Sequence, residues 1–233
     1  MRPSFCLFFL LFSTAIFAQK EREKYPEIMN QDWPNLQKYQ EANAAISEPP
    51  VAVFMGNSIT EGWVNMHPQF FSENKYVGRG ISGQTTPQML IRFQQDVIDL
   101  QPEVVVILAG TNDIAGNTGY SSEKMITDNI RSMVVLAQAN DIKVVLSSIL
   151  PVYDYRWRPG LEPVAKIKSI NSWLKDYASE NGLVYLDYFS KMKDDRDGLP
   201  IEYSEDGVHP TSAGYDVMQP MAQKAIQEAL ENQ

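Results

Sequence analysis

The feature that most constrains this chain of 233 residues is a repeated alternation between short apolar runs and longer helical patterns. Residues 104–109 and 143–150 are almost continuously apolar and rich in β-branched side chains, which is typical of strands buried on both faces. Shorter runs of the same kind lie at residues 51–55, 76–77 and 183–186. The sequence therefore predicts a sheet of about five strands.

Apolar residues at helical spacing fill the gaps between these runs and predict helices over residues 87–100, 121–140, 163–180 and 211–230. Pro220 is expected to kink or split the last of them. Strands that alternate with helices predict a parallel sheet covered on both faces. We therefore predict an α/β fold, a three-layer α/β/α flavodoxin-like sandwich, whose ligand crevice lies beyond the carboxyl ends of the strands.

The charge of the chain bears on its partners. Lys and Arg number 20 against 29 for Asp and Glu, which gives a net charge of -9. A chain this acidic lacks the basic surface of a nucleic-acid-binding protein, and anionic lipid surfaces would repel it. Cys6 is the single cysteine, so the chain cannot form an internal disulfide.

The first residues have the layout of a secretory signal peptide, residues 1–18. Arg2 precedes an uncharged apolar run over residues 4–17, and a charged stretch follows Ala18. The run is shorter than the roughly 20 residues that a spanning helix needs, so we predict export to the periplasm or the exterior without stable membrane insertion.

Two further segments follow the predicted signal peptide. Residues 19–50 predict an N-terminal helical extension docked on the core, with apolar residues at helical spacing and an end at Pro49-Pro50. Residues 51–233 form the main domain. Four loops in this domain combine glycine with small polar or titratable residues, namely residues 56–62, 78–83, 110–113 and 206–210. The predicted topology brings all four to one rim of the sheet.

These loops carry the residue types that acyl transfer from an ester needs: a hydroxyl nucleophile, a base in contact with it, and a group that orients the base. Ser58 opens a helix, where its backbone N–H is available as a donor. His209 follows Asp206 by three residues, so a local turn would aim the carboxylate at one imidazole nitrogen and leave the other for Ser58. The second histidine, His67, is interpreted as a loop or helix-end residue.

Each of these residues also has an ordinary structural interpretation. Ser58 alone could cap a helix, Asp206-Gly207 could form a turn, and His209 could be a surface residue. Gly80 could mark a positive φ, and Asn112-Asp113 could be an Asx turn. Their joint placement at one rim favours the catalytic interpretation.

Other site classes fit the sequence less well. The first loop lacks the lysine of a phosphate-binding P-loop, and Thr60 replaces the second glycine of a G-x-S-x-G elbow. Two histidines, one of them needed as the base, disfavour a zinc site.

The four loops resemble the sequence blocks of the SGNH superfamily, also called GDSL-type esterases and lipases, and within it the bacterial acylhydrolases related to platelet-activating-factor acetylhydrolase. The resemblance runs from about Val51 to the last helix. It implies a catalytic triad of Ser58, Asp206 and His209, with no metal or organic cofactor. It also implies an oxyanion hole made by the N–H groups of Ser58 and Gly80 and by the side-chain amide of Asn112.

The family has an aspartate before the nucleophile where this chain has Asn57. That position is not a member of the triad, so we expect the chemistry to be retained.

The substrate is predicted more coarsely than the chemistry. We expect a secreted esterase acting on a small acyl group, with acetyl on a carbohydrate as the first candidate. The aromatic and arginine side chains of residues 152–160 could bind a sugar or a polar head group, although a packed connecting loop is an equal alternative. The predicted substrate contacts are Asn57, Trp63, Tyr153 and Trp157.

Three other functions remain open at this point. They are a lysophospholipase or other acylhydrolase, an acyltransferase, and a catalytically inactive carbohydrate-binding protein. The sequence does not indicate an oligomeric state.

Overall fold

The computed structural model describes residues 31–232, so the predicted signal peptide lies outside the described residues. The chain divides into two units, residues 1–33 and 34–233. Within the first unit only residues 31–33 are described, and they contain no helix or strand. The second unit contains every element discussed below.

Five parallel strands form one sheet in the order β2-β1-β3-β4-β5. This confirms the predicted α/β fold, and the order is that of flavodoxin-like sheets. In the register, Gly56 at the end of β1 lies beside Gly80 at the end of β2, so the loops that follow these strands are neighbours. The strands are β1 (Ala52–Gly56), β2 (Tyr76–Gly80), β3 (Val104–Ile107), β4 (Lys143–Ser147) and β5 (Val184–Leu186).

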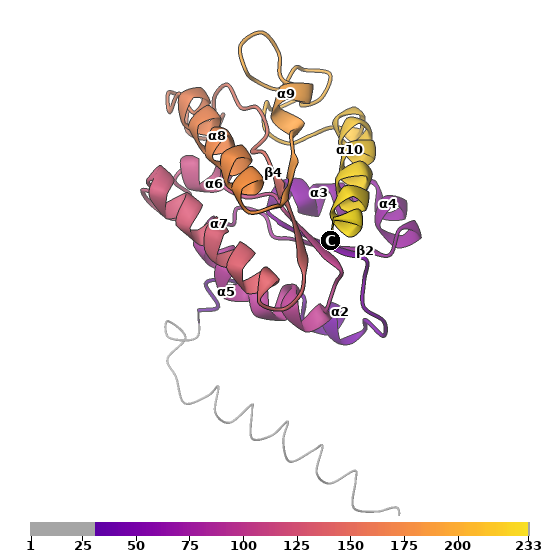
Figure 1. The fold of residues 1–233 in the computed structure, drawn as a ribbon. Helices are drawn as coiled ribbons and strands as arrows, with labels where there is room; N and C mark the ends of the chain where they lie inside the picture. Colours follow the sequence, from indigo (N-terminus) through magenta and orange to yellow (C-terminus); the bar gives the residue numbers. More distant parts are fainter. Residues whose placement is uncertain (1–30, 233) are drawn as a thin grey trace, which may run out of the picture. The chain divides into compact units, whose positions relative to one another are not determined.

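Helices cover both faces of this sheet (Figure 1). Successive side chains of a strand point to opposite faces, so Val53 and Met55 of β1 pack into one apolar core, while Ala52 and Phe54 pack into the other. This explains why the strands read as continuous apolar runs. The first core is closed by α5 (Thr86–Asp96), α7 (Glu123–Gln138) and α8 (Val164–Glu180), and the second by α3 (Ser58–Met66), α4 (Pro68–Glu73) and α10 (Ser212–Glu231).

The predicted N-terminal helix is much shorter than its spacing indicated. Within the described part of residues 19–50 it is reduced to α2 (Gln40–Ala44). Asn35 has a φ of 56°, a left-handed conformation that a right-handed helix cannot contain. The remaining short elements are α6 (Thr111–Ile114), α9 (Tyr188–Met192) and the 3-10 helix η2 (Ile98–Leu100).

The C-terminal helix differs from its prediction in one respect. α10 runs without a break from Ser212 to Glu231 although Pro220 lies inside it, so the proline does not split the helix. Among residues 31–232, no helix combines the length and apolar character that crossing a bilayer would require.

Candidate active site

The site begins at the turn between β1 and α3, where Asn57 alone separates the strand from the helix. The side chain of Asn57 caps α3 by accepting a hydrogen bond of 3.0 Å from the backbone N–H of Ile59. Ser58 is the first helical residue, so its N–H has no acceptor within the helix. Asn57 is buried and committed to this cap, so its predicted role as a substrate contact is corrected.

Three side chains from two distant parts of the chain, Ser58 at this turn and Asp206 and His209 on one late loop, contact one another in a row. The Ser58 hydroxyl is 2.9 Å from Nε2 of His209. Nδ1 of the same imidazole is 2.6 Å from Oδ2 of Asp206. The structure therefore brings Ser58, His209 and Asp206 into the contacts that the sequence predicted.

The charge of Asp206 determines which imidazole nitrogen carries the proton. Partial desolvation raises the pKa of Asp206, but hydrogen bonds from the His209 side chain and from the backbone N–H groups of His209 and Val208 outweigh it and lower the pKa to about 2. An ionised carboxylate only accepts hydrogen bonds, so Nδ1 of a neutral His209 must be the donor. Nε2 is then left as an acceptor for the proton of Ser58.

The loop that carries Asp206 and His209 is held by the carboxylate itself. Oδ1 of Asp206 accepts hydrogen bonds from the Ser204 hydroxyl at 3.1 Å and from the backbone N–H groups of Val208 and His209, both at 2.8 Å. One carboxylate oxygen thus closes the turn while the other orients the imidazole. The loop lies between α9 and α10, so α9 separates it from the end of β5.

Gly80 ends β2 against the first turn of α3. A Cβ atom at this position would lie 2.3 Å from the backbone nitrogen of Glu61 and 2.5 Å from the carbonyl oxygen of Asn57. Only glycine permits so close an approach of two backbones. The backbone of Gly80 therefore lies beside the turn that carries Ser58.

Asn112 lies in the short helix α6, which follows β3. Its side chain is buried, and Nδ2 donates a hydrogen bond of 2.9 Å to the carbonyl oxygen of Gln84. An amide nitrogen carries two hydrogens, so this bond leaves the second for a ligand. Asn112 is thus tied to the loop that follows Gly80.

The segment over residues 153–160 is hydrogen-bonded to α6 and the loop after it and lies beside His209. Tyr155 is fully buried, and its hydroxyl donates a hydrogen bond of 2.9 Å to the carbonyl oxygen of Thr111. Arg158 donates to the carbonyl oxygen of Ala115 at 2.8 Å. Between them, Trp157 is 44% exposed, and its ring centroid lies 6.3 Å from that of His209.

Two small cavities lie near this rim of the sheet, and neither is lined by Ser58, His209 or Asn112. One, of about 270 Å³, is lined by Asp206, by Tyr153 and by Arg156 among others. The other, of about 360 Å³, lies beside α6 and is lined by Asp113 and Leu161 among others. Tyr153 is half exposed, and the Arg196 guanidinium lies 4.8 Å above its ring.

Trp63 does not belong to the site, which corrects a predicted substrate contact. It is 1% exposed and stacks against Phe70 and Tyr215, with ring centroids 5.0 and 5.5 Å away. The helical period explains this, because Trp63 lies one turn after Ile59 on the face of α3 that packs on the sheet.

His67 ends α3 and precedes α4, as interpreted from the sequence. It connects these helices to α10 through Ser212, whose hydroxyl lies 3.1 Å from Nε2.

The structure adds two buried polar residues that the sequence analysis did not single out, Gln84 and Arg92. The sequence does carry a sign of Arg92, because this charged residue lies between Met89 and Phe93 on the apolar face of its helix. Gln84 had no comparable signal, because its partners come from other parts of the chain.

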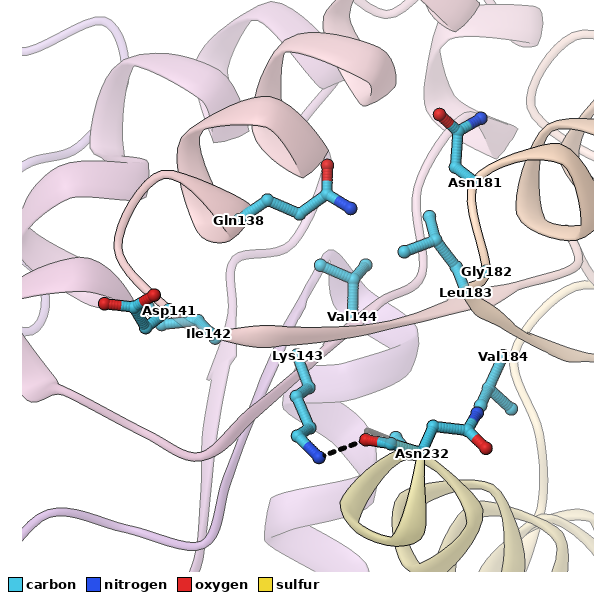
Figure 2. A pocket seen from close by; sticks show the side chains of 11 residues that line it. Gln138, Asp141, Ile142, Lys143, Val144, Asn181, Gly182, Leu183, Val184 and Asn232 are labelled. Atoms are coloured by element: carbon cyan, nitrogen blue, oxygen red, sulfur yellow. Dashed lines mark hydrogen bonds between the residues drawn. The ribbon is translucent and has the colours of Figure 1, made fainter.

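A further cavity, of about 280 Å³, lies at the opposite edge of the sheet, where β4 and β5 begin (Figure 2). Lys143 Nζ donates there to the carbonyl oxygens of Leu230 and Asn232, at the end of α10. No predicted site residue lines this cavity. Within residues 31–232, no three side chains of the types that bind metals form a group.

A serine hydroxyl that contacts an imidazole oriented by a carboxylate, at the strand ends of an α/β sheet, is the arrangement of serine hydrolases. A model of the GDSL-like lipase/acylhydrolase family matches residues 54–217. This range covers more than half of the chain, which therefore belongs to this family of ester hydrolases.

Solved structures resemble the chain over most of its length. A Bacteroides fragilis protein that is named only provisionally as an acylhydrolase is 51% identical, with a TM-score of 0.84, and the match covers 86% of this chain and 100% of that one. A GDSL-like lipase from Bacteroides thetaiotaomicron is 46% identical, with a TM-score of 0.82, over 85% of this chain and 100% of that one.

A curated relative matches a shorter stretch. A Bacillus subtilis lipoprotein is 31% identical over 96 residues, and this match spans 40% of each chain. The chain thus covers less than half the length of this relative.

Proposed function

We propose that this protein is an exported serine esterase that hydrolyses a small acyl ester, with an acetyl ester of a carbohydrate as the first candidate substrate. The observation that carries the proposal is the row of contacts from Ser58 through His209 to Asp206. The low pKa of Asp206 supports it, because an ionised carboxylate keeps the imidazole in the tautomer that can accept a proton from serine.

The proposed reaction has two halves. Ser58 Oγ attacks the ester carbonyl while His209 Nε2 takes its proton, and the tetrahedral intermediate collapses when His209 returns that proton to the departing alcohol. The Ser58 N–H and the second amide hydrogen of Asn112 are the proposed donors to the oxyanion. The N–H of Gly80 faces away from β1, on the side where its carbonyl oxygen accepts from the Tyr39 hydroxyl, so Gly80 is not proposed as a donor. Water activated by His209 then releases the acid from the acyl-enzyme.

The alcohol portion is proposed to bind against Trp157. Its partly exposed indole lies beside His209, on the side where the leaving alcohol must receive its proton. Tyr155 and Arg158 hold the segment rigid on either side of it, so little flexibility is lost when a ring stacks there. An exposed aromatic ring on a rigid support suits the face of a sugar.

An acetyl xylan esterase shares the fold, with a TM-score of 0.62 at 18% identity. That similarity concerns the fold alone, so the proposed substrate depends on Trp157 beside His209.

Export is proposed from the sequence of residues 1–18, and the match to a lipoprotein supports it. Expression of the full chain in a bacterium tests the proposal. Mature protein recovered outside the cytoplasm should begin at Gln19. An intact N-terminus in the cytoplasmic fraction would contradict export.

Turnover of p-nitrophenyl acetate by the wild type and by Ser58→Ala tests the chemistry. We expect turnover by the wild type and none above the uncatalysed rate in the variant. Ser212→Ala is the matched control, because Ser212 also contacts a histidine, His67, but lies outside the row. It should keep full activity. Activity retained in Ser58→Ala would contradict the proposed nucleophile.

The substrate is tested with a panel of acetylated xylo-oligosaccharides, p-nitrophenyl esters of increasing chain length, and lysophosphatidylcholine. We expect kcat/KM to be highest for the acetylated sugars. A preference for long acyl chains or for the lysolipid would contradict the proposed substrate class while leaving the esterase chemistry intact.

A further inference from the structure

The helix α5 carries a guanidinium group into the core beneath the candidate site. Arg92 is 0% exposed, and its Nη1 donates a hydrogen bond of 2.9 Å to Asp96, which is also fully buried. A buried ion pair of this kind often stabilises a fold no more than apolar side chains of the same volume would. Stability alone therefore does not account for the placement of Arg92.

The other nitrogens of Arg92 contact the two sides of the site. Nη2 donates a hydrogen bond of 2.9 Å to the carbonyl oxygen of Gly56, two residues before Ser58. Nε donates at 2.6 Å to the side-chain oxygen of Gln84. One planar group thus touches both the strand end that precedes Ser58 and the loop that precedes α5.

Gln84 links Arg92 to Asn112 by hydrogen bonds. Its side chain is fixed at both ends, because Oε1 accepts from Arg92 and Nε2 donates at 2.6 Å to the carbonyl oxygen of Pro34. Its main-chain oxygen accepts the 2.9 Å hydrogen bond from Asn112 Nδ2. A continuous set of hydrogen bonds therefore links Asn112 through Gln84 and Arg92 to Gly56.

We propose that Arg92 is a positioning residue that fixes the side-chain amide of Asn112 relative to Ser58. The inference rests on the esterase function proposed above, in which this amide binds the oxyanion. A guanidinium offers its donors in a rigid, planar fork, so it can hold Gly56, Gln84 and Asp96 in one geometry. An error of about 1 Å in such a constellation can cost about 10²-fold in rate.

The first test is Arg92→Lys, assayed with p-nitrophenyl acetate. Lysine keeps the charge opposite Asp96, but one ammonium group cannot reach all three acceptors. We expect kcat to fall about 10- to 10²-fold with KM unchanged, because the displaced amide matters most in the transition state. Wild-type kcat in this variant would overturn the inference.

Met133→Ala is the control for a general loss of stability. Met133 is fully buried on α7 in the same core, and no hydrogen bond links it to the site. This variant should unfold at a lower temperature with unchanged kcat. If kcat fell as far as in Arg92→Lys, a general softening of the core would explain both, and the positioning role would be overturned.

A double variant covers the case in which Arg92→Lys does not fold. Arg92→Met combined with Asp96→Asn removes both charges together, so that neither is left buried alone. The same loss of kcat is expected, and wild-type kcat would again overturn the inference.

A double-mutant cycle of Arg92→Lys and Asn112→Ala tests whether Arg92 acts through Asn112. If it does, Arg92→Lys should lower kcat in the wild type but have little further effect in the Asn112→Ala background. Full additivity would overturn the inference. Failure of the proposed function would be recognised by a different result, namely wild-type activity in Ser58→Ala.

Discussion

The exchange of Asp206 for asparagine separates the two tasks of this side chain. The carboxylate closes its own loop through Oδ1 and orients His209 through Oδ2. Asparagine has the same shape and keeps one oxygen for the loop, but it places an NH₂ group where Oδ2 meets Nδ1. His209 must then accept at Nδ1 and carry its proton on Nε2, the nitrogen that faces Ser58.

The expected effect follows from this change of tautomer. An imidazole that is protonated at Nε2 cannot take the proton of Ser58, so kcat should fall about 10⁴-fold, as for the corresponding exchange in serine proteases. This loss equals about 5.4 kcal/mol of transition-state stabilisation. KM should change little, because no contact with the ground-state substrate is removed.

Steady-state kinetics at pH 7 with p-nitrophenyl acetate measure the effect, and thermal unfolding reports on the loop. Asp187→Asn is the matched control: Asp187 caps α9 by accepting a hydrogen bond from Ser190 N–H and lies outside the row. This control should keep wild-type kcat. A loss of less than tenfold in Asp206→Asn, with the fold intact, would refute the reasoning about the tautomer.

Three further predictions concern other parts of the structure. Asn112→Ala should lower kcat about 10²- to 10³-fold in steady-state assays, and a change confined to KM would show that Asn112 binds only the ground state. Trp157→Ala should raise KM for acetylated xylo-oligosaccharides but not for p-nitrophenyl acetate; equal changes would exclude a role in binding the sugar. Burial raises the pKa of Asp113 to about 6, although hydrogen bonds from Thr86 oppose the rise. The folded protein therefore holds a proton near pH 5 that the unfolded chain releases, so this contribution to the free energy of unfolding is full below about pH 4 and is lost as the pH rises through 6. Urea titrations should show the wild type less stable relative to Asp113→Asn at pH 7 than at pH 4, and the opposite sign would contradict the shift.

The layered fold could be predicted because its signals are local. The apolar runs of β3 and β4 and the amphipathic patterns of α7 and α8 lie within a few residues of their predicted bounds, since burial on one or both faces leaves a periodic mark in the sequence. The N-terminal extension was predicted only in part, because α2 is short although Asn43 within it bonds to Asp96 of the core. Its spacing predicted a helix, but the left-handed conformation of Asn35 interrupts the segment.

The contacts of Ser58, Asp206 and His209 could be predicted because parallel topology brings separate loops to one rim. Other contacts could not, because they depend on which way a side chain faces. Trp63 is five residues after Ser58 yet packs in the core, one helical turn after Ile59, so closeness to Ser58 in the sequence does not place it in the site. The contacts of Arg92 join strands and loops whose proximity exists only in the folded chain.

The central claim is that Ser58 is the nucleophile and that His209 activates it. Incubation with an alkyl fluorophosphonate, followed by peptide mass spectrometry, tests this directly, because the reagent forms a stable adduct with an activated serine. We expect one adduct, on Ser58 of the wild type, and a large loss of labelling in His209→Ala. An unmodified Ser58 in protein that turns over p-nitrophenyl acetate, or equal labelling without the imidazole, would contradict the account.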